Sequence, residues 1–333
     1  MSTERTYIIA EIGSNHNGDI TLAKELIDSA AAAGVDAVKF QTFKAKEHYS
    51  KYSPGFGYLE QKNTYSLIES LEIDRSWHEI LFDYAKVKGV SFLSSACDSE
   101  AVQELGRLGM EMFKVASFDI TDLSLIREMA QWGRTMILST GMASWTDIER
   151  AVVTCREVDN NDIVLLQCTS LYPAPPRLAN LRAMETMARA FGVRTGYSDH
   201  TLGTHVCVAA VAAGARMIEK HITIDRGMEG PDHKFAIESD ELRALVAEIR
   251  DVESAMGDGG KFGPHMEEME MYEKGRRSLH ARRDIIRGQM IEEDDICVKR
   301  PGYGITPALR NIIVGRVARQ DIPEDKWITW DDI

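Results

Sequence analysis

The feature that most constrains the fold is a repeat, in which short apolar runs with polar ends alternate with segments of helical periodicity. Eight such runs occur, at 7–12, 37–41, 91–96, 112–117, 136–140, 163–168 and in the two runs closed by His200 and His221. Runs of this length are typical of buried strands. Strands that alternate with helices of about 10 to 15 residues indicate a parallel sheet. We therefore predict an α/β fold whose eight strand–helix units close into a (β/α)8 TIM barrel.

Capping signals support the predicted helices and indicate where each of them begins within the repeat. Asp19 precedes the first helical segment, Asp98 the third and Ser144 the fifth, where Asp147 follows at the spacing of a capping box. In a TIM barrel the active site lies at the C-terminal ends of the strands. The polar ends of the runs therefore fall where this fold places its chemistry.

The chain is longer than one barrel. Its 333 residues exceed the usual barrel by about 70. Glycine and proline between 257 and 264 break the helical pattern, and the short apolar runs beyond 277 are separated by turns. We predict a barrel domain at 1–256, a linker at 257–276 and a small, mainly β domain at 277–333. Such a small domain buries little core, so we expect it to pack on another surface in a homo-oligomer.

Charge and composition exclude several classes of function. The net charge of −13 disfavours nucleic acid and anionic membranes as partners. No stretch approaches the roughly 18 apolar residues of a membrane span, and the first residues lack the apolar core of a signal peptide. We expect a cytoplasmic protein. Five cysteines without a Cys-x-x-Cys pair indicate core thiols rather than disulfides or a zinc–thiolate site.

Two histidines at neighbouring strand ends predict a metal site. His200 and His221 each close an apolar run, so their imidazoles should lie together at the barrel mouth. A divalent ion held by two neutral imidazoles keeps positions open for water and substrate oxygens. The alternative for each is a hydrogen-bonded structural histidine. The remaining histidines without a motif are interpreted as surface residues: His48, His78, His265 and His280.

Two lysines lie inside apolar runs and predict an anion site. Burying Lys39 or Lys114 is costly without a partner or a function. Serine hydroxyls at other strand ends could join them around a phosphate and a carboxylate. Two alternatives stay open: the lysines pair with carboxylates, or one forms an imine with a keto substrate as in a Schiff-base pyruvate aldolase. Asp119 either takes part in the chemistry or caps the next helix with Thr121.

Several motifs, in order along nearly the whole chain, resemble those of the sialic acid synthase family. They are 9–18 (IAEIGSNHNG), 38–42 (VKFQT), 113–117 (FKVAS), 138–142 (LSTGM), 196–201 (GYSDHT) and 219–221 (EKH). The segment 299–305 (KRPGYGI) is similar to the antifreeze-like SAF domain of the bacterial members. The resemblance implies condensation of phosphoenolpyruvate with an N-acylated amino sugar to form a nonulosonic acid. It also implies a divalent ion, typically manganese, with magnesium or another divalent ion able to substitute.

The resemblance assigns roles to single residues. It implies that Asp232 binds a sugar hydroxyl. From its chemistry, we place Glu11 against the sugar, where its carboxylate binds hydroxyls and moves protons. The resemblance also implies that Arg300 enters the site of the partner subunit, in a domain-swapped homodimer. The residues expected to bind phosphoenolpyruvate or to lie beside it are Lys39, Gln41, Lys114, Ser117, Ser139 and Ser198. The remaining substrate-binding candidates are Ser95, Ser170 and Tyr172.

Departures from the family pattern leave the acceptor sugar open. Asp119 stands where sialic acid synthases usually have glutamate, and Ser170 stands where they usually have asparagine. Both replacements resemble the pseudaminic acid branch. The segment 230–234 instead resembles the neuraminic and legionaminic branches. The acceptor is N-acetylmannosamine or a 6-deoxy diacetamido hexose. Aromatic residues of the loop 44–63 either stack on the sugar or pack the loop: Tyr49, Tyr52, Phe56 and Tyr58. A non-catalytic carbohydrate-binding protein is the further alternative.

Overall fold

The chain forms two compact units. The computed structural model describes residues 5–55 and 64–333. The first unit is Met1–Asp258 and the second is Gly259–Ile333. Within the residues described, no helix has both the length and the apolar character that a membrane crossing requires.

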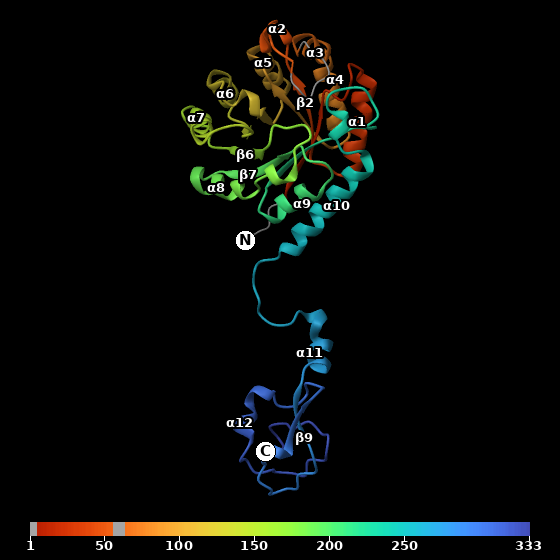
Figure 1. Cartoon of the computed structure of the whole chain (residues 1–333), viewed down its shortest axis with the longest axis vertical. Coiled ribbons are helices and arrows are strands. Elements are labelled where there is room, and N and C mark those ends of the chain that lie inside the picture. Colours follow the sequence, from red (N-terminus) through yellow and green to blue (C-terminus); the bar gives the residue numbers. More distant parts are fainter. Residues whose placement is uncertain (1–4, 56–63) are drawn as a thin grey trace. The chain divides into compact units, whose positions relative to one another are not determined.

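The first unit is a closed barrel of eight parallel strands, as the sequence predicts (Figure 1). The strands follow one another around the barrel in chain order, and β1 closes the ring by pairing with β8. Their bounds are β1 Tyr7–Gly13, β2 Ala37–Thr42, β3 Ser91–Ala96, β4 Met112–Val115, β5 Thr135–Ser139, β6 Ile163–Cys168, β7 Arg194–Asp199 and β8 Met217–His221.

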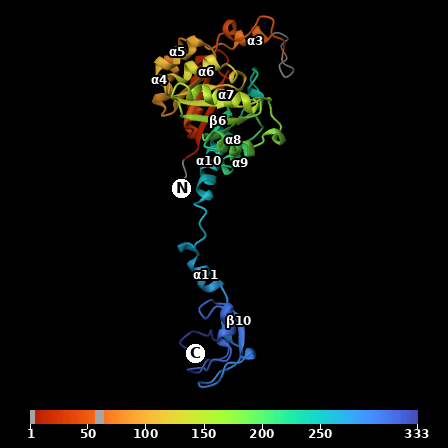
Figure 2. The same ribbon diagram turned by 90° about the vertical axis from the view of Figure 1, so that its left-hand side faces the viewer.

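Helices surround the strands, as the two views of the barrel show (Figures 1 and 2). Their bounds are α1 Ile20–Ala33, α2 Ala45–His48, α3 Thr64–Ser70, α4 Trp77–Val87, α5 Ser99–Leu108, α6 Leu123–Ala130, α7 Trp145–Arg156, α8 Arg182–Phe191, α9 His205–Ala212 and α10 Ser239–Met256. The predicted caps Asp19, Asp98 and Ser144 are confirmed, because each side chain accepts a hydrogen bond from the first turn of its helix.

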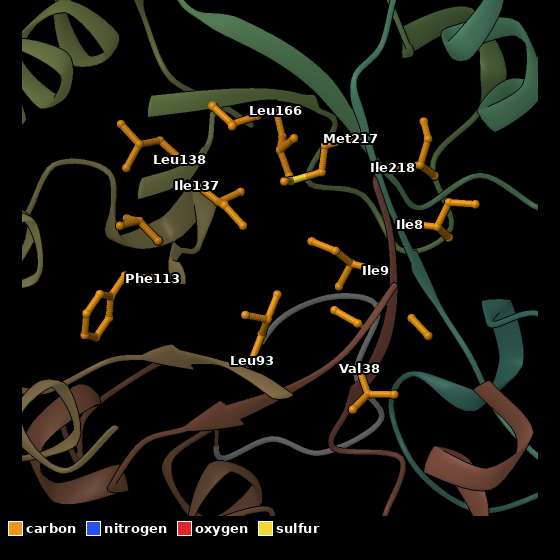
Figure 3. Packing of buried hydrophobic residues seen from close by; sticks show 14 of the residues in the cluster. Ile8, Ile9, Val38, Leu93, Phe113, Ile137, Leu138, Leu166, Met217 and Ile218 are labelled. Carbon is orange, nitrogen blue, oxygen red and sulfur yellow. The ribbon is translucent and has the colours of Figure 1, made fainter. Parts of the chain in front are cut away.

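Side chains of the strands alternate between the barrel interior and the helix layer. In Figure 3, Ile9, Leu93, Ile137 and Met217 point toward one another inside the barrel, whereas Ile8 and Ile218 point outward. All six are buried. This alternation follows from the two-residue period of a strand. Because the apolar layer fills the middle of the barrel, the polar residues farther along the same strands must gather at the C-terminal mouth.

Strand register places the polar residues side by side. Glu11 pairs with Lys39 of β2 on one side and with His221 of β8 on the other. Ser95 pairs with Lys114, and Ser198 pairs with Glu219. These neighbours share one level of the barrel, so one mouth holds carboxylates, ammonium groups, hydroxyls and imidazoles together.

The second unit is small and mainly β. Strands β9 Ser278–Ala281 and β10 Ile296–Lys299 pair antiparallel (β10 is labelled in Figure 2). Helices α11 Met269–Gly275 and α12 Arg310–Ile313 are short. Its buried apolar core is separate from that of the barrel and includes Leu279, Ala281, Ile285, Ile291, Ile296, Ile305, Ile313, Ala318, Ile322, Ile328 and Ile333.

Candidate active site

A cavity of about 170 Å³ opens at the C-terminal ends of the barrel strands. It is lined by most of the residues predicted for the site, namely Glu11, Lys39, Gln41, Ser95, Lys114, Ser117, Asp119, Ser139, Tyr172, Ser198, His200, His221 and Asp232. Ser170 does not line it, although its hydroxyl lies beside Gly141. Arg300 belongs to the second unit, where its Nε donates to the carbonyl oxygen of Gly275 at 2.6 Å.

Two lysines and two glutamates form a buried charge network at the cavity floor. Lys39 Nζ lies 2.6 Å from Glu11 Oε2 and 3.8 Å from Glu219 Oε2. Lys114 Nζ lies 3.6 Å from Glu219 Oε1, which also accepts a hydrogen bond from Ser198 Oγ at 2.8 Å. The four charged side chains are at most 5% exposed. Both lysines therefore lie beside carboxylates, as one of the sequence alternatives states, and both also line the cavity.

The two lysines of this network differ in how far nearby carboxylates compensate their positive charge. Burial disfavours the charge of Lys39, but Glu11 and Glu219 together hold its pKa above the usual range. Burial lowers the pKa of Lys114, and Glu219 opposes that shift only in part. Within the described residues, the hydrogen bond of Lys114 Nζ goes to the carbonyl oxygen of Val115 at 3.3 Å. Lys114 is therefore the cation that gains most from a bound anion.

Glu11 is a carboxyl group poised to exchange a proton near neutral pH. Burial raises its pKa to about 7, although Lys39 beside it opposes the shift. Gln41 Nε2 donates to Glu11 Oε1 at 2.8 Å and fixes the carboxyl group. A Cβ on Gly13 would lie 3.0 Å from Glu11 Oε1, so the bare backbone there gives the carboxyl group its space.

Hydroxyls at the ends of β4 to β6 supply donors without partners. Ser139 Oγ and Ser170 Oγ are buried and have no hydrogen-bond partner among the described residues. Ser117 Oγ accepts from Gly141 N at 3.0 Å. A Cβ on Gly141 would lie 2.4 Å from Ser170 Oγ and 2.8 Å from Ser117 Oγ. Only glycine allows these hydroxyls to approach this backbone closely, and such a cradle suits an oxyanion.

His200 and His221 lie together, as predicted. Their ring centroids are 5.3 Å apart, and Tyr172 packs 4.3 Å from the ring of His200. His200 Nδ1 lies 2.9 Å from the carbonyl oxygen of Thr169, which leaves Nε2 for a metal. His221 Nδ1 is buried without a hydrogen-bond partner in the described chain, 3.5 Å from Asp232 Oδ2. Burial, with the neighbouring His200, keeps the pKa of His221 far below its usual range, so its ring is the neutral form that binds a metal.

Asp232 and Asp119 both line the cavity. Burial raises the pKa of Asp232 to about 6. Burial also raises the pKa of Asp119, with His48 and Lys114 opposing the shift. Asp119 ends the short 3₁₀ helix Ser117–Asp119, and the cap of α6 is Asp122. The interpretation of Asp119 as a helix cap was therefore wrong, because Asp122 accepts the hydrogen bond from Leu125 N.

The structure adds residues that the sequence interpretation missed. Glu219 bridges the two lysines, and its signal was available, because it lies two residues before His221 on the same face of the same strand. Phe235 packs 5.0 Å from the ring of His221. His48 and Cys97 also line the cavity. Neither had a motif around it.

The surface interpretation was wrong for three of the four histidines. His78 is buried, and its ring bonds Thr42 Oγ1 at 3.0 Å and Glu104 Oε1 at 2.7 Å. His280 is buried in β9. His48 lines the cavity with only 20% of its side chain exposed, and His265 is exposed as expected.

The aromatic residues of the loop 44–63 behave differently from one another. Tyr49 lines the cavity, and Tyr52 is exposed. Phe56 and Tyr58 lie outside the described residues.

Comparison with known proteins identifies relatives of both units. The NeuB family matches residues 26–261, and the SAF domain matches 276–333. N,N'-diacetyllegionaminic acid synthase of Campylobacter jejuni subsp. jejuni serotype O:2 is 41% identical over 98% of this chain and 99% of its own. Pseudaminic acid synthase of the same serotype is 34% identical over 96% and 94% of the two chains. N-acetylneuraminic acid (sialic acid) synthetase from Leptospira borgpetersenii serovar Hardjo-bovis, solved in complex with citrate, has a TM-score of 0.73 and 35% identity over 80% of this chain and 90% of that chain.

Proposed function

Because the chain belongs to the NeuB family and ends in a SAF domain, we propose that it is a nonulosonic acid synthase. Its substrates are phosphoenolpyruvate and the open-chain form of an N-acylated amino sugar. The observation that carries the proposal is the incompletely balanced, buried Lys114 in a cavity that also offers the Ser139 hydroxyl, which has no hydrogen-bond partner among the described residues. A cation and an open hydroxyl donor in one cavity suit a ligand with a phosphate and a carboxylate.

Phosphoenolpyruvate is assigned to the side of the cavity formed by β4, β5 and β7. Lys114 supplies the charge, and the hydroxyls of Ser117 and Ser139 supply directional donors. The Ser198 hydroxyl donates to Glu219 in the free protein, so it serves phosphoenolpyruvate only by turning away from that carboxylate. A bound anion would complete the hydrogen bonds of Ser139 and balance the charge of Lys114. Both changes remove a cost that the free protein carries.

The divalent ion is assigned to His200 and His221. A neutral His221, whose Nδ1 has no hydrogen-bond partner in the part of the chain that the structure describes, and a His200 oriented by Thr169 fit a metal that keeps open positions for oxygen ligands. We propose Mn²⁺, with Mg²⁺ or another divalent ion as a substitute. When bound, the ion supplies Lewis acidity that polarises the aldehyde of the sugar.

The reaction forms a carbon–carbon bond and a bond from C2 to a water oxygen, and it breaks the bond from C2 to the phosphate oxygen. C3 of phosphoenolpyruvate attacks the aldehyde carbon, and the aldehyde oxygen takes a proton, for which Glu11 with its pKa of about 7 is the donor within the cavity. Water adds to the cationic C2 and gives its proton to a carboxylate, the role proposed for Asp119. The C2–O bond to the phosphoryl group then breaks as the new C2 hydroxyl gives its remaining proton to the departing phosphate, which leaves a keto group at C2.

The proposed acceptor is a 6-deoxy diacetamido hexose of the legionaminic type. The relative named for N,N'-diacetyllegionaminic acid is 41% identical, against 34% for the relative named for pseudaminic acid. Asp232 beside His221, and Gln41 bonded to Glu11, are the groups proposed to bind sugar hydroxyls.

A Schiff-base pyruvate aldolase is the second candidate, because burial lowers the pKa of Lys114 and so favours its neutral amine. Borohydride reduction in the presence of pyruvate tests it. The synthase proposal predicts no covalent adduct on Lys114, and an adduct there would favour the aldolase.

The test of the proposed function is product formation from phosphoenolpyruvate with Mn²⁺. N-acetylmannosamine and the 6-deoxy diacetamido hexoses of the legionaminic and pseudaminic types are offered separately. Products are identified by mass spectrometry with and without a chelator. The proposal predicts one nonulosonic acid, formed chiefly from the legionaminic-type sugar and abolished by the chelator. Formation without any divalent ion, or no product from any of the sugars, would contradict it.

A further inference from the structure

Three potential metal ligands outside the proposed catalytic metal site converge at the cavity lining. His48 ends α2, Cys97 follows β3 directly, and Asp119 ends the 3₁₀ helix after β4. One ring nitrogen, the thiol sulfur and one carboxylate oxygen lie within 4.8 Å of one another. Among the residues that the structure describes, this is the one group of three such donors at this spacing.

The donors of this group are held in place by their surroundings. The His48 ring stacks on Phe43 with centroids 6.3 Å apart and meets Tyr49 edge-on at 4.9 Å. Cys97 N donates to the carbonyl oxygen of Thr42 at 3.0 Å, and Asp119 N donates to that of Ala116 at 3.0 Å. Fixed backbones and a packed ring reduce the entropy that a bound ion must offset.

The spacing leaves room for an ion. His48 Nε2 and Asp119 Oδ1 are 3.9 Å apart, too far for a hydrogen bond. Ligand bonds to zinc of about 2.0 to 2.3 Å at tetrahedral angles put donor atoms roughly 3.3 to 3.7 Å apart. The donor atoms, which lie within 4.8 Å of one another, therefore need to approach by at most about 1.5 Å to surround a zinc ion.

The donor set selects the kind of metal. One thiolate, one imidazole and one carboxylate are ligands that Zn²⁺ accepts, whereas Mn²⁺ prefers oxygen ligands. Thiolate and carboxylate together carry two negative charges, which match the charge of Zn²⁺. Three protein ligands leave a fourth position for water on the cavity side. We propose that His48, Cys97 and Asp119 form a second metal site, selective for Zn²⁺ and related thiophilic divalent ions.

Binding at this site is a proton-coupled step. Cys97 gives up its thiol proton to the buffer when its sulfur ligates the ion. The same event removes Asp119 from the cavity chemistry, because its carboxylate becomes a ligand. Zinc is therefore expected to inhibit the enzyme, a consequence that rests on the proposed function, whereas the binding itself does not.

The experiment is a Co²⁺ titration of the full-length, chelator-treated protein, read by thiolate-to-cobalt charge-transfer absorption in the near ultraviolet. Co²⁺ substitutes for Zn²⁺ and reports a cysteine ligand directly. The matched control is Cys168→Ser, because the Cys168 thiol lies 3.8 Å from His200 Nδ1, at the proposed catalytic metal site. We expect Cys97→Ser to abolish the absorption and Cys168→Ser to retain it.

Zinc affinity, measured by competition with a chromophoric chelator, gives the second readout. Loss of an outer-shell partner typically lowers metal affinity about 10-fold to 100-fold, and loss of one of three direct ligands should lower it more. We therefore expect His48→Gln to weaken zinc binding by more than about 100-fold. Absorption that persists in Cys97→Ser, or that is lost in Cys168→Ser, would overturn the proposal. So would an unchanged zinc affinity in His48→Gln.

Inhibition is measured separately, as each variant's rate with zinc relative to its own rate without zinc. Loss of zinc inhibition in His48→Gln is expected. Cobalt absorption in a protein that forms no nonulosonic acid would leave the metal site standing and would refute the proposed function alone.

Discussion

At the scale of single residues, two buried serines of the barrel differ in whether their hydroxyl has a partner. Ser139 Oγ has none among the described residues and lines the cavity. Ser94 Oγ is buried in the barrel wall and lies 2.8 Å from Thr42 Oγ1. A buried hydroxyl without a partner lowers stability, whereas a bonded one raises it. The proposal that Ser139 binds phosphoenolpyruvate explains why the protein keeps its unpartnered hydroxyl.

Ser139→Ala should therefore separate binding from stability. We expect the KM for phosphoenolpyruvate to rise about 10-fold to 100-fold, the value of one hydrogen bond to a charged group, while the unfolding temperature stays equal or rises. Ser94→Ala is the matched control and should lose about 1 kcal/mol of stability with an unchanged KM. Steady-state kinetics and thermal unfolding measure both. An unchanged KM in Ser139→Ala would remove Ser139 from the site.

Glu11 gives a prediction about pH. With a pKa of about 7, its carboxyl group changes charge within the working range of pH. Glu11→Gln should reduce kcat by about 10² to 10⁴, the usual contribution of a positioned acid or base. The wild-type pH profile should bend near pH 7, and the residual activity of Glu11→Gln should lack that bend. A bend that persists in the variant would assign it to another group.

The same group makes stability depend on pH, and the sign follows from its raised pKa. The folded chain holds the Glu11 proton more tightly than a group with the ordinary pKa of 4.5. Its contribution to stability is complete below pH 4.5 and is lost as pH rises through about 7. Urea unfolding should show wild type losing stability relative to Glu11→Gln across this range. An equal pH dependence of the two proteins would contradict the raised pKa.

At the scale of elements, the sequence was sufficient to predict the strands and most of the residues at the cavity floor. The strand ends could be predicted because the two-residue period fixes which side chains share a face, and barrel closure then brings these ends together. His48 and Cys97 could not be predicted, because their positions depend on how the segments after β2 and β3 fold over the mouth. Local sequence encodes that packing weakly.

The contact between β7 and β8 depends on one glycine. A Cβ on Gly196 would lie 2.2 Å from the carbonyl oxygen of Met217, which belongs to the neighbouring strand backbone and cannot move aside. Gly196→Ala should destabilise the barrel by about 3 kcal/mol or more. The measurement is thermal unfolding together with the yield of folded protein.

Gly227→Ala is the control for this substitution. Gly227 is exposed, and its added Cβ would meet the exposed Asp225 carboxylate at 3.1 Å, whose Oδ1 accepts from Gly227 N at 2.7 Å and is a side chain rather than backbone. We expect a loss of less than about 1 kcal/mol. Equal unfolding temperatures for the two variants would contradict the strand contact as the cause.

At the scale of the whole molecule, the arginine expected in the site belongs to the second unit and not to the barrel. Arg300 belongs to Gly259–Ile333, and the cavity is lined by residues of the barrel. We propose that Arg300 of the partner subunit completes the site, as the family resemblance implies. An arrangement between subunits cannot be derived from the sequence of one chain.

Mixing two inactive variants tests this arrangement. Lys114→Ala removes the barrel site and Arg300→Ala removes the arginine. After dissociation and random pairing, a shared site predicts about a quarter of wild-type activity, because half of the dimers are mixed and each has one intact site. A site complete within one chain predicts that the mixture has only the sum of the two residual activities.

The most direct test of the synthase account follows the oxygen that links C2 to phosphorus in phosphoenolpyruvate. With ¹⁸O in that position, C–O cleavage predicts that the released phosphate carries the label, and that release requires both the diacetamido sugar and a divalent ion. Label retained in the keto acid, or phosphate released at the same rate without sugar, would contradict the account.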